Sequence, residues 1–138
     1  MNLNKSREVF DPAKITAPIH IIGCGSVGST IAELLARYGL TKFTLWDMDK
    51  VEEKNLVNQM FFDDHVGMKK VDALRDILGN INLTCNETVK VKPDGWHGEP
   101  LAGYVFLAVD DIAIRRDIVK RNQYNANIKA MFDVRTAL

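Results

Sequence analysis

An apolar run that breaks into three glycines, IHIIGCGSVG, constrains the fold of this chain more than any other stretch. Gly23, Gly25 and Gly28 match the spacing G-x-G-x-x-G, which is typical of a strand followed by a tight turn and a helix. The turn requires the first glycine, close approach of a phosphate requires the second, and close packing of the helix on the sheet requires the third. The sequence therefore predicts a phosphate-binding turn at residues 23–28.

The segments that flank this turn strengthen the prediction. A helix that begins near Ser26 and continues through Val27 would direct its unpaired N–H groups and the positive end of its dipole at an anion. The next strand, expected at residues 42–46, ends at Asp47, about 20 residues beyond the last glycine. An acidic side chain at that position accepts hydrogen bonds from ribose hydroxyls in mononucleotide-binding βαβ units. The favoured interpretation is a nucleotide site.

Strands and helices alternate along the rest of the chain. The continuous apolar run YVFLAV predicts a parallel strand that is covered on both faces, and the polar segment LTCNETVKV predicts an edge strand. We expect Gly79-Asn80 to end the second helix, and the turn-rich segment PDGWHGEP leaves no room for a crossover helix. The predicted fold is a Rossmann-like, doubly wound α/β domain with a mainly parallel sheet and helices on both faces. The expected strands are 19–22, 42–46, 83–91, 104–109 and 128–133, and the expected helices are 26–38, 67–78 and 112–122.

Length and composition indicate one globular domain. We expect an N-terminal arm at residues 1–18 and a nucleotide-binding domain at 19–138. The 138-residue chain has 18 basic and 18 acidic residues, so no net charge favours nucleic acid or an anionic membrane surface. Its N-terminus lacks the apolar core of a signal peptide, and a cytoplasmic location is the expectation.

Two cysteines are present, and they form no CxxC motif, so we expect no zinc site. Cys24 lies within the glycine turn, at the start of the predicted helix. Either it is a small residue that fills a tight turn, or the helix N-terminus lowers the pKa of its thiol.

Taken together, four motifs resemble those of the ThiF/MoeB superfamily, the adenylyltransferases related to ubiquitin-activating enzymes. They are GCGSVG at 23–28, DMDKVEEKNLVNQ at 47–59, VGMKKV at 66–71 and AVDD at 108–111. The match covers roughly residues 15–135 and corresponds to the N-terminal half of a usual family domain, so we expect a domain shorter than is typical of the family.

The resemblance implies that the chain binds ATP and Mg²⁺ and activates the C-terminal carboxylate of a ubiquitin-like or sulfur-carrier protein as an acyl-adenylate. It also implies a homodimer. Carried over by motif, Asp47 and Asp49 of the D-x-D pair belong to the nucleotide site, with Asp47 on the ribose. Asn55 and Lys70 would reach the phosphates, although Lys69 beside Lys70 leaves the register open, and Asp110 would contact the metal ion.

One departure from the family pattern affects the chemistry. The family has arginine in N-L-x-R-Q, whereas this chain has Asn58, which is neutral and cannot pair with a transferring phosphate. We therefore predict that Arg7, in the N-terminal arm, supplies the missing charge across a dimer interface. Asp111 also departs from the family asparagine, and either Asp110 or Asp111 could be the N-cap of the following helix.

Two other functions remain open at this point. Asn58 and the short length are also compatible with a catalytically weak or inactive nucleotide-binding scaffold, such as one partner in a heterodimer. The glycine turn and Asp47 alone would fit an NAD-binding dehydrogenase-type domain, whereas NLVNQ and VGMKKV would not.

Overall fold

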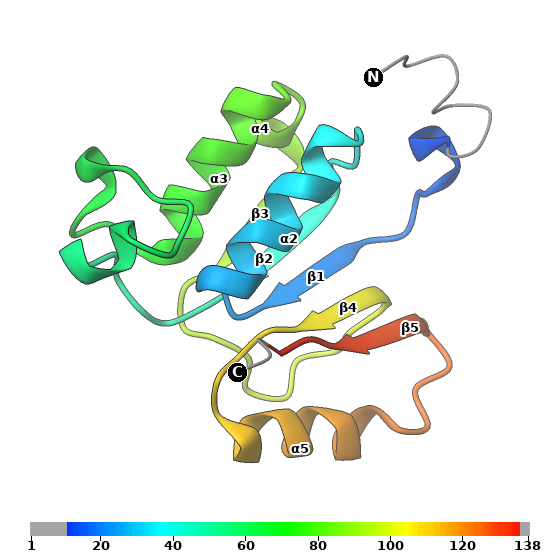
Figure 1. The fold of residues 1–138 in the computed structure, drawn as a ribbon. Coiled ribbons are helices and arrows are strands. Elements are labelled where there is room, and N and C mark those ends of the chain that lie inside the picture. Colours follow the sequence, from blue (N-terminus) through cyan, green and yellow to red (C-terminus); the bar gives the residue numbers. More distant parts are fainter. Residues whose placement is uncertain (1–10, 136–138) are drawn as a thin grey trace.

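The computed structural model describes residues 11–135, which form a five-stranded sheet with helices on both faces (Figure 1). All the strand pairs in this part of the chain are parallel. The strands are β1 (Ile19–Ile22), β2 (Phe43–Trp46), β3 (Lys90–Lys92), β4 (Gly103–Leu107) and β5 (Ile128–Asp133). The helices are α2 (Ser26–Arg37), α3 (Lys70–Ile81), α4 (Cys85–Thr88) and α5 (Ile112–Asn122), with short 3-10 helices η1 (Pro12–Lys14), η2 (Glu53–Leu56) and η3 (Asp63–His65).

The strand order is β3-β2-β1-β4-β5, with β1 at the centre. The chain builds β2 and β3 on one side of β1 and then crosses to build β4 and β5 on the other side. This reversal creates a topological switch point between β1 and β4, and open α/β sheets bind ligands just beyond the carboxyl ends of the strands at such a point. The doubly wound, parallel α/β fold predicted from the sequence is confirmed.

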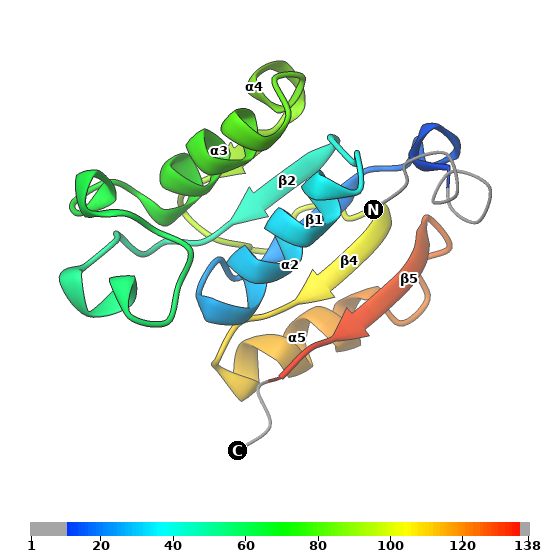
Figure 2. The same ribbon diagram turned by 45° about the horizontal axis from the view of Figure 1, so that its top comes forward.

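Helices cover the two faces of the sheet unequally. Helices α2 and α3 pack on one face, and α5 packs on the other face beneath β4 and β5 (Figures 1 and 2). Ile21 and Leu45 lie in the core on the α2 side, and Leu107 and Ile118 lie in the core on the α5 side. All four residues of β1 are buried, because the central strand is covered from both faces.

The structure corrects the prediction of a single strand over 83–91. Only Lys90–Lys92 form strand β3, whereas Cys85–Thr88 form the short helix α4. Cys85 is fully buried in the core, and the side chain of Thr88 donates a hydrogen bond to the carbonyl of Thr41. The alternation of apolar and polar residues in this segment predicted a strand. A helical turn gives the same alternation here, because it buries Cys85 and exposes the residues on either side. β3 does lie at the edge of the sheet, as its polarity predicted.

The sequence predicted that the second helix ends at Gly79-Asn80, and this is wrong. Helix α3 continues to Ile81, and Asn82 leaves the helix with an extended backbone. A Cβ at position 79 would overlap the side-chain amide of Asn86, so this glycine allows α4 to pack closely on α3. The connection from β3 to β4 contains no helix, as predicted.

Residues 11–18 lead into the first strand along the edge of the fold. The carbonyl of Pro18 accepts a hydrogen bond from the backbone N–H of Tyr104 at 3.0 Å, and Lys42 Nζ donates to the carbonyl of Thr16 at 3.3 Å. The predicted arm at 1–18 stays a prediction, and Arg7 lies outside the described residues. No helix in residues 11–135 is long and apolar enough to span a membrane.

Candidate nucleotide-binding site

A cavity of about 730 Å³ opens at the carboxyl ends of β1, β2 and β4, where the switch point lies. Most of the residues predicted for the nucleotide site line it, although they come from four separate segments of the chain. They are Gly23, Gly25, Ser26, Val27, Asp47, Asp49, Lys70 and Asp110. Gly28 and Asn55 do not line this cavity.

The three glycines of the turn have different structural roles. Gly23 has a φ of +99°, which favours glycine, and a Cβ there would lie 2.7 Å from the backbone of Ala108. A Cβ at Gly28 would overlap the carbonyl oxygen of Gly23, so this glycine lets α2 begin against the turn. At Gly25 the nearest atom to a Cβ would be Gln59 Nε2, at 3.7 Å. Gly25 therefore leaves room on the cavity side of the turn, where a phosphate would approach.

The carboxylate of Asp47 connects the end of β2 to the glycine turn. Its Oδ2 accepts a hydrogen bond from the backbone N–H of Cys24 at 2.8 Å, and its Oδ1 accepts one from the N–H of Asp49 at 2.8 Å. Each carboxylate oxygen can accept a second hydrogen bond. Asp47 can therefore hold the turn and still accept a ribose hydroxyl.

Cys24 is a buried turn residue and not an activated thiol. Its side chain is inaccessible to solvent. Burial raises the pKa of the Cys24 thiol well above its ordinary value, and the neighbouring Asp47 carboxylate adds to this effect. Desolvation outweighs the two lowering influences, which are the hydrogen bond to the Trp46 carbonyl and the charge of Lys70, so the structure favours the small turn residue over the thiol of lowered pKa.

The ammonium group of Lys70 reaches the cavity from the start of α3. Lys70 is only 7% exposed, and within residues 11–135 its ammonium makes no hydrogen bond or ion pair. Lys69 instead donates to the carbonyl of Met48 at 3.1 Å, and of the two neighbouring lysines only Lys70 lines the cavity. The ammonium is accessible from the cavity, where an anion would pair with it.

Asn55 lies beneath the site as a local structural residue. It is 8% exposed, and its Oδ1 accepts a hydrogen bond from the backbone N–H of Glu52 at 2.8 Å, which closes the start of η2. Contact of Asn55 with a phosphate stays a prediction. Asn58, which stands where the family has arginine, does line the cavity.

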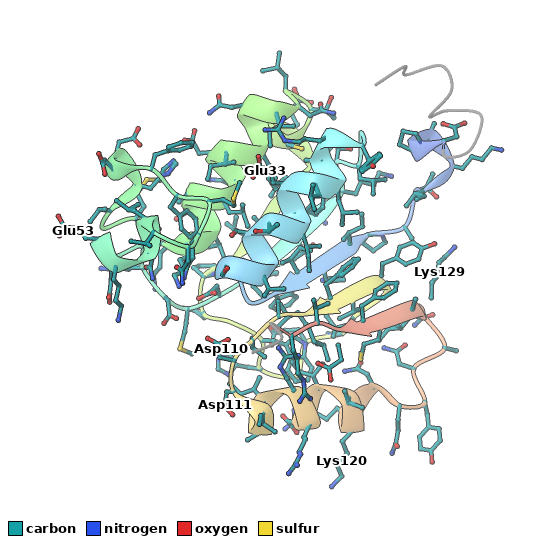
Figure 3. The ribbon with its side chains drawn as sticks, in the orientation of Figure 1. Glu33, Glu53, Asp110, Asp111, Lys120 and Lys129 are labelled. Carbon is teal, nitrogen blue, oxygen red and sulfur yellow. The ribbon has the colours of Figure 1, made fainter. Side chains whose placement is uncertain are left out.

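Asp110 and Asp111 follow β4 and have separate roles at the start of α5 (Figure 3). The Asp111 side chain is the N-cap, because its Oδ1 accepts hydrogen bonds from the N–H groups of Ala113 at 2.8 Å and Ile114 at 3.3 Å. Asp111 is therefore the N-cap of α5, which the sequence left open between Asp110 and Asp111. Asp110 lines the cavity and does not cap the helix.

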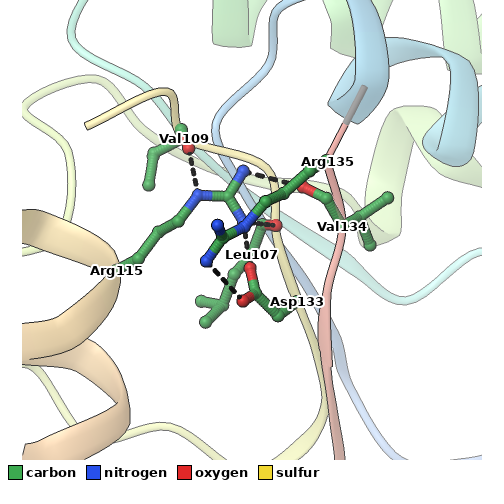
Figure 4. A network of polar contacts seen from close by, with 6 residues as sticks. All are labelled: Leu107, Val109, Arg115, Asp133, Val134 and Arg135. Atoms are coloured by element: carbon green, nitrogen blue, oxygen red, sulfur yellow. Dashed lines mark hydrogen bonds and ion pairs between the residues drawn. The ribbon is translucent and has the colours of Figure 1, made fainter. Parts of the chain in front are cut away.

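A buried arginine holds the loop that carries Asp110. Arg115 donates from Nε to the carbonyl of Val109 at 2.6 Å, from Nη1 to the carbonyl of Leu107 at 3.1 Å and from Nη2 to the carbonyl of Val134 at 2.7 Å. Its Nη1 also pairs with Asp133, which Arg135 contacts from the other side (Figure 4). The helical pattern of residues 112–122 predicts that Arg115 faces outward, and this is wrong: Arg115 is 6% exposed, because its guanidinium bonds the backbone carbonyls beside it.

The cavity lining is acidic overall. Carboxylates of Asp47, Asp49, Asp110 and Asp111 face Lys70, whereas Arg121 is already paired with Asp117 at 3.0 Å. A polyphosphate would be repelled by this set unless a cation accompanied it. In residues 11–135, no three His, Cys, Asp or Glu side chains are grouped to hold a metal ion by themselves. Mg²⁺ is typically held by one or two carboxylates together with substrate phosphates, and Asp110 fits that role.

Comparison with known proteins agrees with this geometry. The model of the ThiF family matches residues 15–131. Ubiquitin-like modifier-activating enzyme 5 of Gallus gallus is 45% identical over 84 residues, which are 59% of this chain and 21% of that protein. The Bombyx mori enzyme of the same name is 48% identical over 65 residues, 46% of this chain and 16% of that protein. The chain thus spans about a fifth of the length of these curated relatives.

Solved structures match over more of the chain. E. coli tRNA N6-threonylcarbamoyladenosine dehydratase, TcdA, in complex with ATP superposes with a TM-score of 0.74 at 28% identity over 88% of this chain and 55% of that chain. E. coli MccB with ATP superposes with a TM-score of 0.70 at 25% identity over 80% of this chain and 36% of that chain. The family match covers most of the sequence, and the fold and the arrangement of the motifs agree with it. The chain therefore belongs to the ThiF family.

Proposed function

We propose that this chain binds MgATP in the 730 Å³ cavity and transfers the adenylyl group to the C-terminal carboxylate of a ubiquitin-like or sulfur-carrier protein. The observation that carries the proposal is Lys70, which has no ion-pair or hydrogen-bond partner for its ammonium in the described structure and lines the same cavity as the glycine turn and Asp110. The ATP complexes of TcdA and MccB, which share the fold, support the choice of nucleotide.

The reaction requires a carboxylate oxygen to attack the α-phosphorus of ATP. An acyl–O–P bond forms, the bond between the α-phosphorus and its bridging oxygen breaks, and pyrophosphate leaves. The backbone N–H groups at the start of α2 would hold the phosphates, and Lys70 would offset the charge that develops on them. A Mg²⁺ ion near Asp110 would neutralise further phosphate charge.

Two buried features of the cavity fit a polar ligand. Gln59 lines the cavity, and its Oε1 is a buried atom without a hydrogen-bond partner in the described structure. None of the described side chains caps the N-terminus of α2, which begins at the turn. Unsatisfied donors and acceptors of this kind are expected where a ligand completes the hydrogen bonding.

Asn58 favours a second candidate function, a nucleotide-binding partner with weak or no catalysis. The position carries no charge although it lines the cavity, and loss of a phosphate-directed arginine costs on the order of 10³-fold in related chemistry. Supply of this charge by Arg7 from a second copy of the chain remains our hypothesis. If Arg7→Ala leaves turnover unchanged, that hypothesis is wrong.

Two measurements on the same protein test the function. Calorimetric titration with MgATP and with NAD identifies the nucleotide. If NAD binds and MgATP does not, the proposal is wrong and the chain is an NAD-binding dehydrogenase-type domain. ATP–pyrophosphate exchange is then measured with ubiquitin-like and sulfur-carrier proteins, each with a free C-terminal carboxylate and as its C-terminal amide. Exchange that depends on the free carboxylate and is lost in Lys70→Met supports adenylation. MgATP binding without exchange supports the catalytically weak partner.

A further inference from the structure

The connection between β3 and β4 closes one side of the nucleotide cavity with an aromatic residue. This connection, residues 93–102, contains no helix, and Gly95, Trp96 and His97 from it line the cavity. Trp96 belongs to none of the motifs that carry the family resemblance. Its indole Nε1 donates a hydrogen bond to the carbonyl of Glu99 at 2.9 Å, which fixes the ring edge within its own loop.

Arg121 braces the indole from helix α5. The Arg121 guanidinium carbon lies 5.7 Å from the centre of the Trp96 ring, within the range of a cation–π interaction. Asp117 holds this arginine through a hydrogen bond of 3.0 Å to Nε, one turn away on the same helix. Gly98 lets the guanidinium approach, because a Cβ there would lie 2.7 Å from Arg121 Nη1. The loop and the helix thus form one continuous wall of the cavity.

This wall lies next to the residue predicted to hold the ribose. Met48 follows Asp47, and its side-chain methyl lies 3.9 Å from the position of a Cβ on Gly95, the residue before Trp96. Met48 is 57% exposed and Ile114 is 41% exposed, and both line the cavity. Apolar and aromatic surface therefore adjoins the ribose position, whereas the glycine turn and Lys70 form the polar part of the cavity.

We propose that Trp96, braced by Arg121, is the platform on which the base of the bound nucleotide stacks. A nucleotide with its ribose on Asp47 places its base next to that residue, and the adjacent wall offers an aromatic side chain whose indole is hydrogen-bonded within its own loop. Every base has a π-face that can stack on such a side chain. This inference rests on the proposed function, since it assigns the base of the nucleotide that the same cavity would bind.

The test compares a nucleotide with a ligand that lacks the base. MgATP and magnesium tripolyphosphate are titrated calorimetrically into the wild type, Trp96→Ala, Trp96→Phe and Tyr124→Ala. Tyr124 is 92% exposed and does not line the cavity, so its variant is the matched control for loss of an aromatic side chain. We expect Trp96→Ala to weaken MgATP binding about tenfold, with tripolyphosphate binding unchanged. Trp96→Phe and Tyr124→Ala should bind MgATP nearly as well as the wild type.

Tryptophan fluorescence gives a second measurement that does not depend on the alanine variant folding. The protein has two tryptophans, and both line the cavity, but Trp46 is 2% exposed and hydrogen-bonded to His20, so Trp96 should report most of the change on MgATP binding. Most of that change should be lost in Trp96→Phe and should not occur with tripolyphosphate.

Three results would overturn the inference: equal weakening of both ligands in Trp96→Ala, no weakening of MgATP binding in that variant, or an emission change of undiminished size in Trp96→Phe. If the wild type does not bind MgATP at all, the proposed function and this inference both fail. If MgATP binding depends on Trp96 but no carboxylate supports pyrophosphate exchange, the base platform stands and adenylation fails.

Discussion

Asp47 at the end of β2 accepts a hydrogen bond from the backbone N–H of Cys24 at 2.8 Å, and this bond joins the second strand to the glycine turn after the first. A second bond, from the N–H of Asp49 to the other carboxylate oxygen, fixes the orientation of the side chain. The acidic residue that the sequence assigned to the ribose therefore also shapes the turn that would hold the phosphates.

Asp47→Asn should reduce both stability and nucleotide binding. The amide keeps the size of the side chain, but its NH₂ group cannot accept one of the two backbone hydrogen bonds. We expect a loss of about 1–3 kcal/mol in the free energy of unfolding and weaker MgATP binding. Urea denaturation and calorimetry measure the two effects. Asp64→Asn, at an exposed position outside the cavity, is the control and should change neither.

Lys70→Met should weaken MgATP binding without destabilising the fold. The substitution removes an ammonium that has no partner in residues 11–135 and keeps an unbranched side chain of similar length. We expect the free energy of unfolding of the ligand-free protein to change by less than about 1 kcal/mol, because no hydrogen bond or ion pair of the described residues is lost. MgATP binding should weaken by at least tenfold. Lys69→Met, the adjacent variant, should keep MgATP binding, and a similar loss there would contradict the assigned register.

Gly25→Ala and Gly28→Ala should fail in different ways. At position 25 the added methyl group has room, with its nearest neighbour at 3.7 Å, so the fold should persist while the methyl group obstructs the phosphate side of the turn. At position 28 the methyl group would overlap the Gly23 carbonyl oxygen, so we expect a loss of several kcal/mol in stability. Thermal denaturation with and without MgATP distinguishes the two. A folded Gly25→Ala variant with wild-type MgATP binding would argue against phosphate binding at this turn.

His20 should make the protein less stable as the pH falls below neutrality. Burial lowers the pKa of His20 from 6.5 to about 4, with smaller contributions from Lys90 and Lys92, and its Nδ1 accepts a hydrogen bond from Trp46 Nε1 at 2.9 Å. The unfolded chain binds a proton below its pKa of about 6.5, whereas the folded protein resists protonation until about pH 4. Stability is therefore complete above pH 6.5 and decreases progressively between pH 6.5 and about 4.

Urea unfolding of the wild type and His20→Gln at pH 7.5 and 5.0 measures this dependence. The glutamine oxygen can accept the Trp46 hydrogen bond but does not titrate, so the variant should lose less stability between the two pH values. The difference should be on the order of 1–2 kcal/mol at pH 5.0. Equal pH dependence in both proteins would show that the pKa of His20 is not lowered by folding.

Arg115→Met should disorganise the Asp110 loop. It removes three hydrogen bonds to carbonyl groups and the ion pair with Asp133. We expect a loss of about 1–3 kcal/mol in the free energy of unfolding, because the carbonyl groups of Leu107, Val109 and Val134 lose their hydrogen-bond donor. Denaturation measures this loss, and Arg116→Met, at an exposed position on the same helix, is the control.

The acid dependence of the same network provides a further check. Hydrogen bonds from Arg135 and Arg115 lower the pKa of Asp133 below its ordinary value, so its contribution to stability is present above about pH 4 and is lost as the pH falls through the lowered pKa. Arg115→Met should weaken this acid dependence, whereas Arg116→Met should keep it.

The sequence alone determined the fold class, the glycine turn and the family. These depend on local features, since hydrophobic runs, turn glycines and motif spacing act within a few residues. Strand β5 and helix α5 have the bounds that periodicity predicted. Local sequence pattern did not predict the end of α3 beyond Gly79 or the helix α4 before β3. Both depend on the close packing of α4 on α3, which brings together residues that lie apart in the sequence.

Only the tertiary structure decided the roles of neighbouring residues at the cavity. Lys70 lines it and Lys69 does not, because the register of α3 is determined when the helix docks on the sheet. Asp110 and Asp111 both line it, but Asp111 also caps α5 through its side chain. Trp96 and Arg121 meet across a loop and a helix, and no sequence spacing predicts that contact. Sequence patterns specify which chemistry is available, and packing determines which atoms converge on one cavity.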